Sequence, residues 1–121
     1  MNTAATVFSK RYEFSLEKLM TIPQLEEYLR ESMALIGRAL ACNGVIAGHI
    51  KILARLPELA VDRFLFLSLT RLGQIDVAPS KYWSQVSGVS LDRLELHVNV
   101  LIFGYTFNQI EAVVNDALKN K

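Results

Sequence analysis

Two histidines are the residues of this chain best suited to acid–base chemistry. His49 lies in the stretch "NGVIAGHIKILARL" and Lys51 follows it by two residues, while His97 lies in "LELHVNVLIFG" and Asn99 follows it by two. Both stretches are rich in β-branched residues and leucine, which favours strands. Since residues two apart in a strand share one face, each histidine shares its face with a polar neighbour. Glu95 lies on the same face as His97, and a carboxylate beside an imidazole is typical of a general base.

Three interpretations of these residues remain open. One is a small enzyme in which His49 or His97 serves as general acid or base, although no catalytic residue can be assigned. A second is a pocket for a small anionic or polar ligand, with apolar walls and a few polar anchors. A third is structural, with polar side chains bonded across strands or across a subunit interface. The pocket would have walls of Phe64, Phe66, Phe103 and Trp83, and the candidate ligand-binding residues are His49, Lys51, Ser68, Trp83, Arg93, His97 and Asn99.

A metal site is not expected. In a simple meander the second strand would lie between the strands that carry His49 and His97, so the two rings would be about 10 Å apart. That separation is too large for one zinc ion, and no third ligand is evident. No sequence motif for nucleotides, metals or redox chemistry occurs, so no cofactor is expected.

Two helices and at least three strands are predicted to position these residues. Thr21 and Gln24, and again Thr106 and Gln109, have the spacing of a capping box that opens a helix. Apolar residues then recur at helical spacing in both segments. The segment "VFSKRYEF" fits an edge strand, an extended arm or a helix. The strands are expected at about 45–55, 63–72 and 91–103, and "QIDV" could add a short fourth strand.

One face of the predicted sheet is uniformly apolar and requires the helices as cover. These patterns predict a single α+β domain over residues 1–121, with frayed residues 1–6 and a long loop at 73–90. Its core would be an antiparallel β-meander of three to five strands with two amphipathic helices packed on one face. The other face mixes aromatic and polar residues, so a second subunit or the 73–90 loop is expected to cover part of it. Trp83 would fill a hydrophobic gap, or anchor a lid or interface.

Composition narrows the classes of partner. With 51% hydrophobic and 21% charged residues, the chain is slightly apolar-rich for its size, which favours a homo-oligomer. The net charge of +1 gives no basic patch for nucleic acid, and no apolar run is long enough for a transmembrane helix. Cys42 is the one cysteine, which favours the cytoplasm, and we expect a packed, inert thiol.

The function expected from these observations is therefore a non-enzymatic, homo-oligomeric assembly or small-ligand-binding module. It would use the mixed polar and aromatic sheet face, with the small enzyme as the alternative.

Overall fold

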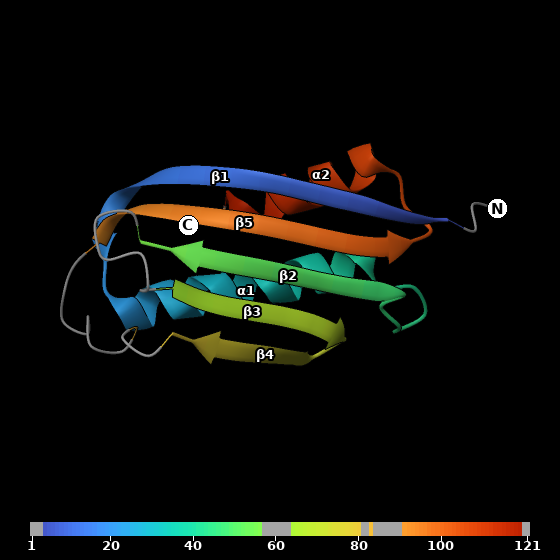
Figure 1. The fold of residues 1–121 in the computed structure, drawn as a ribbon, viewed down its shortest axis with the longest axis horizontal. Coiled ribbons are helices and arrows are strands. Elements are labelled where there is room, and N and C mark those ends of the chain that lie inside the picture. Colours follow the sequence, from blue (N-terminus) through green and yellow to red (C-terminus); the bar gives the residue numbers. More distant parts are fainter. Residues whose placement is uncertain (1–3, 57–63, 81–82, 84–90, 120–121) are drawn as a thin grey trace.

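The computed structural model describes residues 4–56, 64–80, 83 and 91–119 and shows a two-layer α+β fold (Figure 1). Within these residues, five strands form one open antiparallel sheet in the order β1-β5-β2-β3-β4. Both helices lie on the same side of this sheet, as predicted (Figure 1). The elements in chain order are β1 (Ala5–Met20), α1 (Ile22–Leu40), β2 (Gly48–Arg55), β3 (Phe64–Arg71), β4 (Gln74–Pro79), β5 (Leu91–Phe103) and α2 (Phe107–Leu118).

The strand order differs from the simple meander in one respect. The strands β2, β3 and β4 follow one another as a meander, but β5 pairs with β2 and not with β3. The reason is that "QIDV" does form a strand: β4 takes the free edge of β3, so β5 returns to the other side of β2. There β5 also pairs with β1, which begins at Ala5, inside the segment for which fraying was expected.

Both predicted capping boxes are present. Thr21 Oγ1 accepts a hydrogen bond from the backbone N–H of Gln24, and Gln24 Oε1 accepts one from the backbone N–H of Thr21 at 2.9 Å. Thr106 and Gln109 form the same reciprocal pair at the start of α2. These bonds satisfy backbone donors that have no partner inside the helix.

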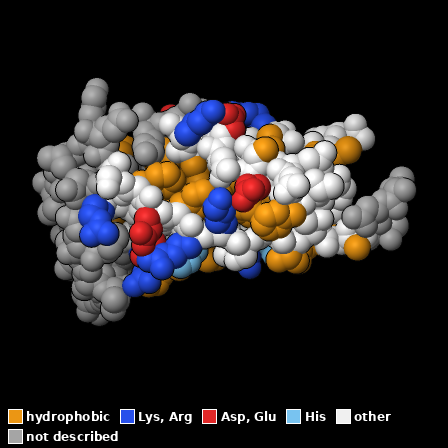
Figure 2. Space-filling view, turned by 90° about the horizontal axis from the view of Figure 1, so that it is seen from above, with side chains coloured by type: hydrophobic (Ala, Val, Ile, Leu, Met, Phe, Trp, Pro, Cys, Tyr) orange, Lys and Arg blue, Asp and Glu red, His pale blue; other side chains and the backbone are white. Residues whose placement is uncertain are grey.

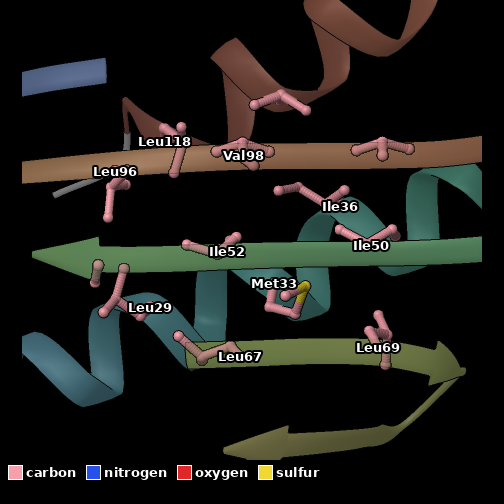
Figure 3. Close-up of a cluster of buried hydrophobic side chains, with 14 of the residues drawn as sticks. Leu29, Met33, Ile36, Ile50, Ile52, Leu67, Leu69, Leu96, Val98 and Leu118 are labelled. Atoms are coloured by element: carbon pink, nitrogen blue, oxygen red, sulfur yellow. The ribbon is translucent and has the colours of Figure 1, made fainter. Parts of the chain in front are cut away.

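The core lies between the sheet and the helices. Figure 3 shows side chains of α1 facing those of β2 and β3, with β5 beside them. Gly37 lets α1 approach closely, because an added Cβ would lie 2.4 Å from Leu69 Cδ2. The buried residues drawn there include Leu29, Met33, Ile36, Ile50, Ile52, Leu67, Leu69, Leu96, Val98 and Leu118.

The expectation of a packed thiol at Cys42 is wrong. Cys42 is exposed, because α1 ends at Leu40 and the chain turns immediately afterwards. A β-bridge joins Cys42 to Val45 across this turn, in which Asn43 and Gly44 both have positive φ, at 54° and 77°.

Candidate functional site

The side of the sheet that faces away from the helices carries most of the candidate residues. We call it the open face. Strand register arranges its side chains in rows that cross the sheet, so residues distant in sequence become neighbours. The described open-face residues are Ala5, Val7, Ser9, Arg11, Glu13 and Ser15 of β1, Arg93, Glu95, His97, Asn99, Leu101 and Phe103 of β5, His49, Lys51, Leu53 and Arg55 of β2, Phe64, Phe66, Ser68 and Thr70 of β3, and Asp76 and Ala78 of β4.

A carboxylate occupies the centre of the charged end of this face. Oε1 of Glu95 lies 2.8 Å from Nε2 of His97, 3.0 Å from Nε of Arg11 and 4.0 Å from Nη1 of Arg55. These partners come from three adjacent strands, β5, β1 and β2. Glu95 is only 7% exposed, and Arg11 also pairs with Glu13. We call Arg11, Arg55, Glu95 and His97 the Glu95 cluster.

The cluster holds Glu95 in its ionised form. The hydrogen bond with His97 is the largest cause that lowers the pKa of Glu95, and the charges of Arg11 and Arg55 lower it further against the opposing effect of burial. An ionised carboxylate only accepts hydrogen bonds, so Nε2 of His97 is the donor. Glu95 therefore orients the imidazole and keeps the arginines in place, and His97 is half-buried beside it.

A polar row crosses the middle of the open face. Register aligns one residue from each strand: Ser9, Asn99, Lys51, Ser68 and Asp76. Ser9 donates its hydroxyl to Oδ1 of Asn99 at 2.8 Å. Lys51 is exposed in the centre of the row, and no ion pair joins it to a carboxylate among the described residues.

The two histidines do not form one site. His49 pairs with Leu101, and His97 pairs with Leu53, which lies four residues further along β2. The two rings lie on adjacent strands, but this offset separates them by roughly 14 Å. In the described part of the chain, no group of three or more His, Cys, Asp or Glu side chains could hold a metal ion.

The four aromatic residues expected to wall a pocket do not lie together. Phe64 shares a row with Glu95, and Phe103 lies eight residues further along β5, or roughly 26 Å away. Trp83 is buried in the core, and its Nε1 donates to Oε1 of Glu26 on α1 at 2.7 Å. Trp83 therefore belongs to the helix layer and fills a hydrophobic gap.

The open face nevertheless gathers most of the candidates. Of the seven predicted ligand-binding residues, His49, Lys51, Ser68, Arg93, His97 and Asn99 lie on it and Trp83 does not. The sequence prediction missed Arg11, Glu13 and Arg55. Arg11 and Glu13 lie on β1, whose sequence also fitted a helix, so its residues were not assigned to the two faces of the sheet. The alternation of Phe8, Tyr12 and Phe14 is the sequence signal that identifies this segment as a strand.

Apolar side chains flank the polar row on both sides. Towards one end lie Val7, Leu101 and Phe103, and Val7 and Phe103 are 65% and 46% exposed. Towards the other end lie Leu53, Phe64 and Phe66, all half-buried. Figure 2 views the β1 side of the molecule, where side chains of both charges lie among hydrophobic ones.

Comparisons with models of protein families, with curated proteins and with solved structures found no match for this chain. No helix among the described residues is both long and apolar enough to cross a bilayer.

Proposed function

We propose that this protein is a homo-oligomeric assembly module whose open face binds the open face of a second copy. The observation that carries the proposal is the exposure of large apolar side chains on a sheet face that neither helix covers. Val7 is 65% and Phe103 is 46% exposed, and contiguous exposed apolar surface of this kind is typical of interaction sites. Two sheets packed face to face would bury these residues between two helix layers.

The register of β5 and β2 supports a contact between two copies of the open face. Consider a two-fold axis that is parallel to the strands and lies midway between β5 and β2. It would place β5 opposite β2 of the partner subunit, and β2 opposite β5 of the partner subunit. Glu95 would then face Arg55 of the partner subunit, and Asn99 would face Lys51 of the partner subunit. Residues of opposite charge, or polar residues, therefore meet in these rows.

Other two-fold arrangements are less favourable. An axis directly over β2 would place Lys51 on Lys51 of the partner subunit and Arg55 on Arg55 of the partner subunit. An axis perpendicular to the strands would place the Glu95 cluster against the apolar end that contains Phe103. The first arrangement brings like charges together, and the second places the whole Glu95 cluster on apolar surface, which is costly. The proposed axis pairs Glu95 with Arg55 of the partner subunit and places only Arg11, Glu13 and His97 against apolar residues of the partner.

The area of the face fits a weak dimer. Four strands are about 19 Å wide, and the stretch from Glu95 to Phe103 is about 26 Å long. The contact is therefore roughly 500 Å² per copy and 1,000 Å² in total, at the lower limit for a specific interface. We expect a dimer that dissociates on dilution, and we propose the cytoplasm as its location because a lone cysteine forms no internal disulfide.

The molar mass in solution tests this proposal. Light scattering after size exclusion should give a mass that rises with concentration towards twice 13.6 kDa. The variant Leu101→Lys places a charge inside the proposed contact and should remain a monomer. Leu35→Lys is the matched control, because Leu35 is 38% exposed on α1 and should leave dimerisation unchanged. A monomer at every concentration of the unaltered chain would contradict the proposal.

One observation favours the enzyme alternative, namely the 2.8 Å hydrogen bond between His97 and Glu95. A carboxylate that orients an imidazole is one half of a general-base site. The cross-strand neighbours of His97 are Arg11 and Leu53, so neither supplies a nucleophile. The test measures the rate of p-nitrophenyl acetate hydrolysis. A rate above that of free imidazole that is lost in His97→Gln would support catalysis. Identical rates in the two proteins would exclude His97 as the base for ester hydrolysis.

A further inference from the structure

The outer edge of β4, which pairs with no strand of the described residues, lies beside an apolar cavity. Among the described residues, β4 is the last strand of the sheet on the side of β3, and α1 contacts β2, β3 and β4. The cavity between α1 and the β3–β4 hairpin has a volume of about 230 Å³. Its lining is mostly aliphatic: Ala34, Arg38, Leu69, Leu72, Gly73 and Ile75.

Three properties of this region indicate what would occupy it. First, β4 pairs only with β3 among the described residues, so half of its backbone donors and acceptors point away from the sheet. Second, the cavity exceeds the volume of about 150 Å³ that accommodates a benzene molecule, so a leucine or phenylalanine side chain fits. Third, Arg38 is one of the residues that line the cavity, and no ion pair joins its guanidinium to a carboxylate in the described part of the chain.

We propose that the edge of β4 binds an extended peptide as a sixth strand, with one large apolar side chain in the cavity and an acidic side chain two residues away on Arg38. Strand addition uses backbone hydrogen bonds for affinity and pockets for alternate side chains for specificity. Residues two apart in the peptide face the same side, so both side chains would point towards the helix layer. This site lies on the opposite side of the sheet from the proposed dimer contact and is independent of it.

The exposed surroundings agree with a peptide partner. Leu35 and Leu72 are 38% and 39% exposed, and Ile75 on β4 is half-buried against the core. In the proposed complex, other side chains of the peptide, on either side of the one that enters the cavity, would cover these apolar side chains. Arg38 lies in the last turn of α1, where a cation also stabilises the helix terminus, so its substitution needs a folding control.

The test uses fluorescence anisotropy with a labelled peptide, Thr-Val-Thr-Leu-Thr-Glu-Thr-Val. The unaltered protein should bind it saturably. Arg38→Gln should weaken binding about tenfold, equivalent to about 1.4 kcal/mol, and Ala34→Phe, which fills the cavity, should weaken it further. Arg30→Gln on the exposed side of α1 is the control and should bind normally, and circular dichroism should show that all variants are folded.

Two altered peptides distinguish strand addition from other binding modes. Two series of peptides carry N-methyl groups on alternate residues, so each series lacks the backbone N–H donors of one edge of the peptide strand. The series that lacks the donors facing β4 should not bind, and the other series should bind normally. Replacing Glu with Lys in the peptide should weaken binding to the unaltered protein and restore it to Arg38→Glu. Absence of saturable binding, equal affinity for both N-methylated series, or binding of octanoate without binding of the peptide would overturn the proposal.

Discussion

Nε2 of His97 lies 2.8 Å from Oε1 of Glu95, and this contact anchors the charged end of the open face. It joins two residues of the same strand, while Arg11 and Arg55 reach the same oxygen from the strands on either side. Three strands are thereby tied together through one buried carboxylate. Glu95 lies on β5, next to the line between β5 and β2 along which we place the two-fold axis of the proposed dimer.

The lowered pKa of Glu95 predicts a loss of stability in acid. A carboxyl group whose pKa is lower in the folded state stabilises the fold above its unfolded pKa of about 4.5, and this stabilisation is lost as the pH falls through the folded value. At pH 7, Glu95→Gln should reduce the free energy of unfolding by about 1 kcal/mol, because its arginine partners remain solvent-accessible. Urea denaturation from pH 7 to pH 3 should show the difference between the two proteins shrinking below pH 4.5. A constant difference would mean that Glu95 does not contribute through its charge.

Gly48 should be far less tolerant of alanine than Gly44. A Cβ on Gly48 would lie 1.9 Å from the carbonyl oxygen of Leu101 on the neighbouring strand, whereas none of the surrounding atoms lies within 4 Å of a Cβ on Gly44. Gly44→Ala should cost about 1 kcal/mol, from its positive φ alone. Gly48→Ala should cost about 3 kcal/mol or more, because β2 and β5 must separate. Thermal unfolding of both variants measures the contrast, and equal melting temperatures would refute it.

The capping box of α2 should contribute measurably to stability. Thr106→Ala removes the hydroxyl that accepts from the backbone N–H of Gln109 and should lower the free energy of unfolding by about 1 kcal/mol. Thr106→Ser keeps this hydroxyl and should restore most of the loss. Urea denaturation of the three proteins is sufficient, and a serine variant as unstable as the alanine variant would show that the hydroxyl is not the cause.

Trp83 should report on the helix layer and not on the open face. It is 1% exposed and its indole N–H is bonded to Glu26, so its fluorescence should be blue-shifted and protected from acrylamide. Since it is the one tryptophan, dimer dissociation by Leu101→Lys should leave the emission unchanged, while Glu26→Gln should shift it. An emission change on dissociation alone would place Trp83 near the interface.

Much of the fold could be predicted from local sequence. The spacing of Thr21 to Gln24 and of Thr106 to Gln109 marked both helix starts, because capping uses residues only three apart. Alternation along β2, β3 and β5 separated the apolar face from the open face, since strand geometry has a period of two. Six of seven candidate residues were placed on the open face for this reason.

Long-range features could not be predicted in the same way. The pairing of β5 with β2 depends on where β4 lies, and no local pattern encodes that choice. The cluster around Glu95 was missed because Arg11 lies on β1, whose sequence also fitted a helix. The layer that Trp83 contacts could not be predicted, because its local sequence fits a residue that fills a hydrophobic gap as well as an anchor of a lid or interface.

Cross-linking that locates the contact between two copies is the most direct test of the claim that the open face forms a dimer. In a Cys42→Ser background, equal amounts of Lys51→Cys and Asn99→Cys proteins are mixed and treated with a short bismaleimide. Because Lys51 and Asn99 would face each other across the contact, we expect a covalent dimer to form much faster in the mixture than in the Leu35→Cys protein. Cross-linking no faster than in the Leu35→Cys control would contradict a dimer built on the open face.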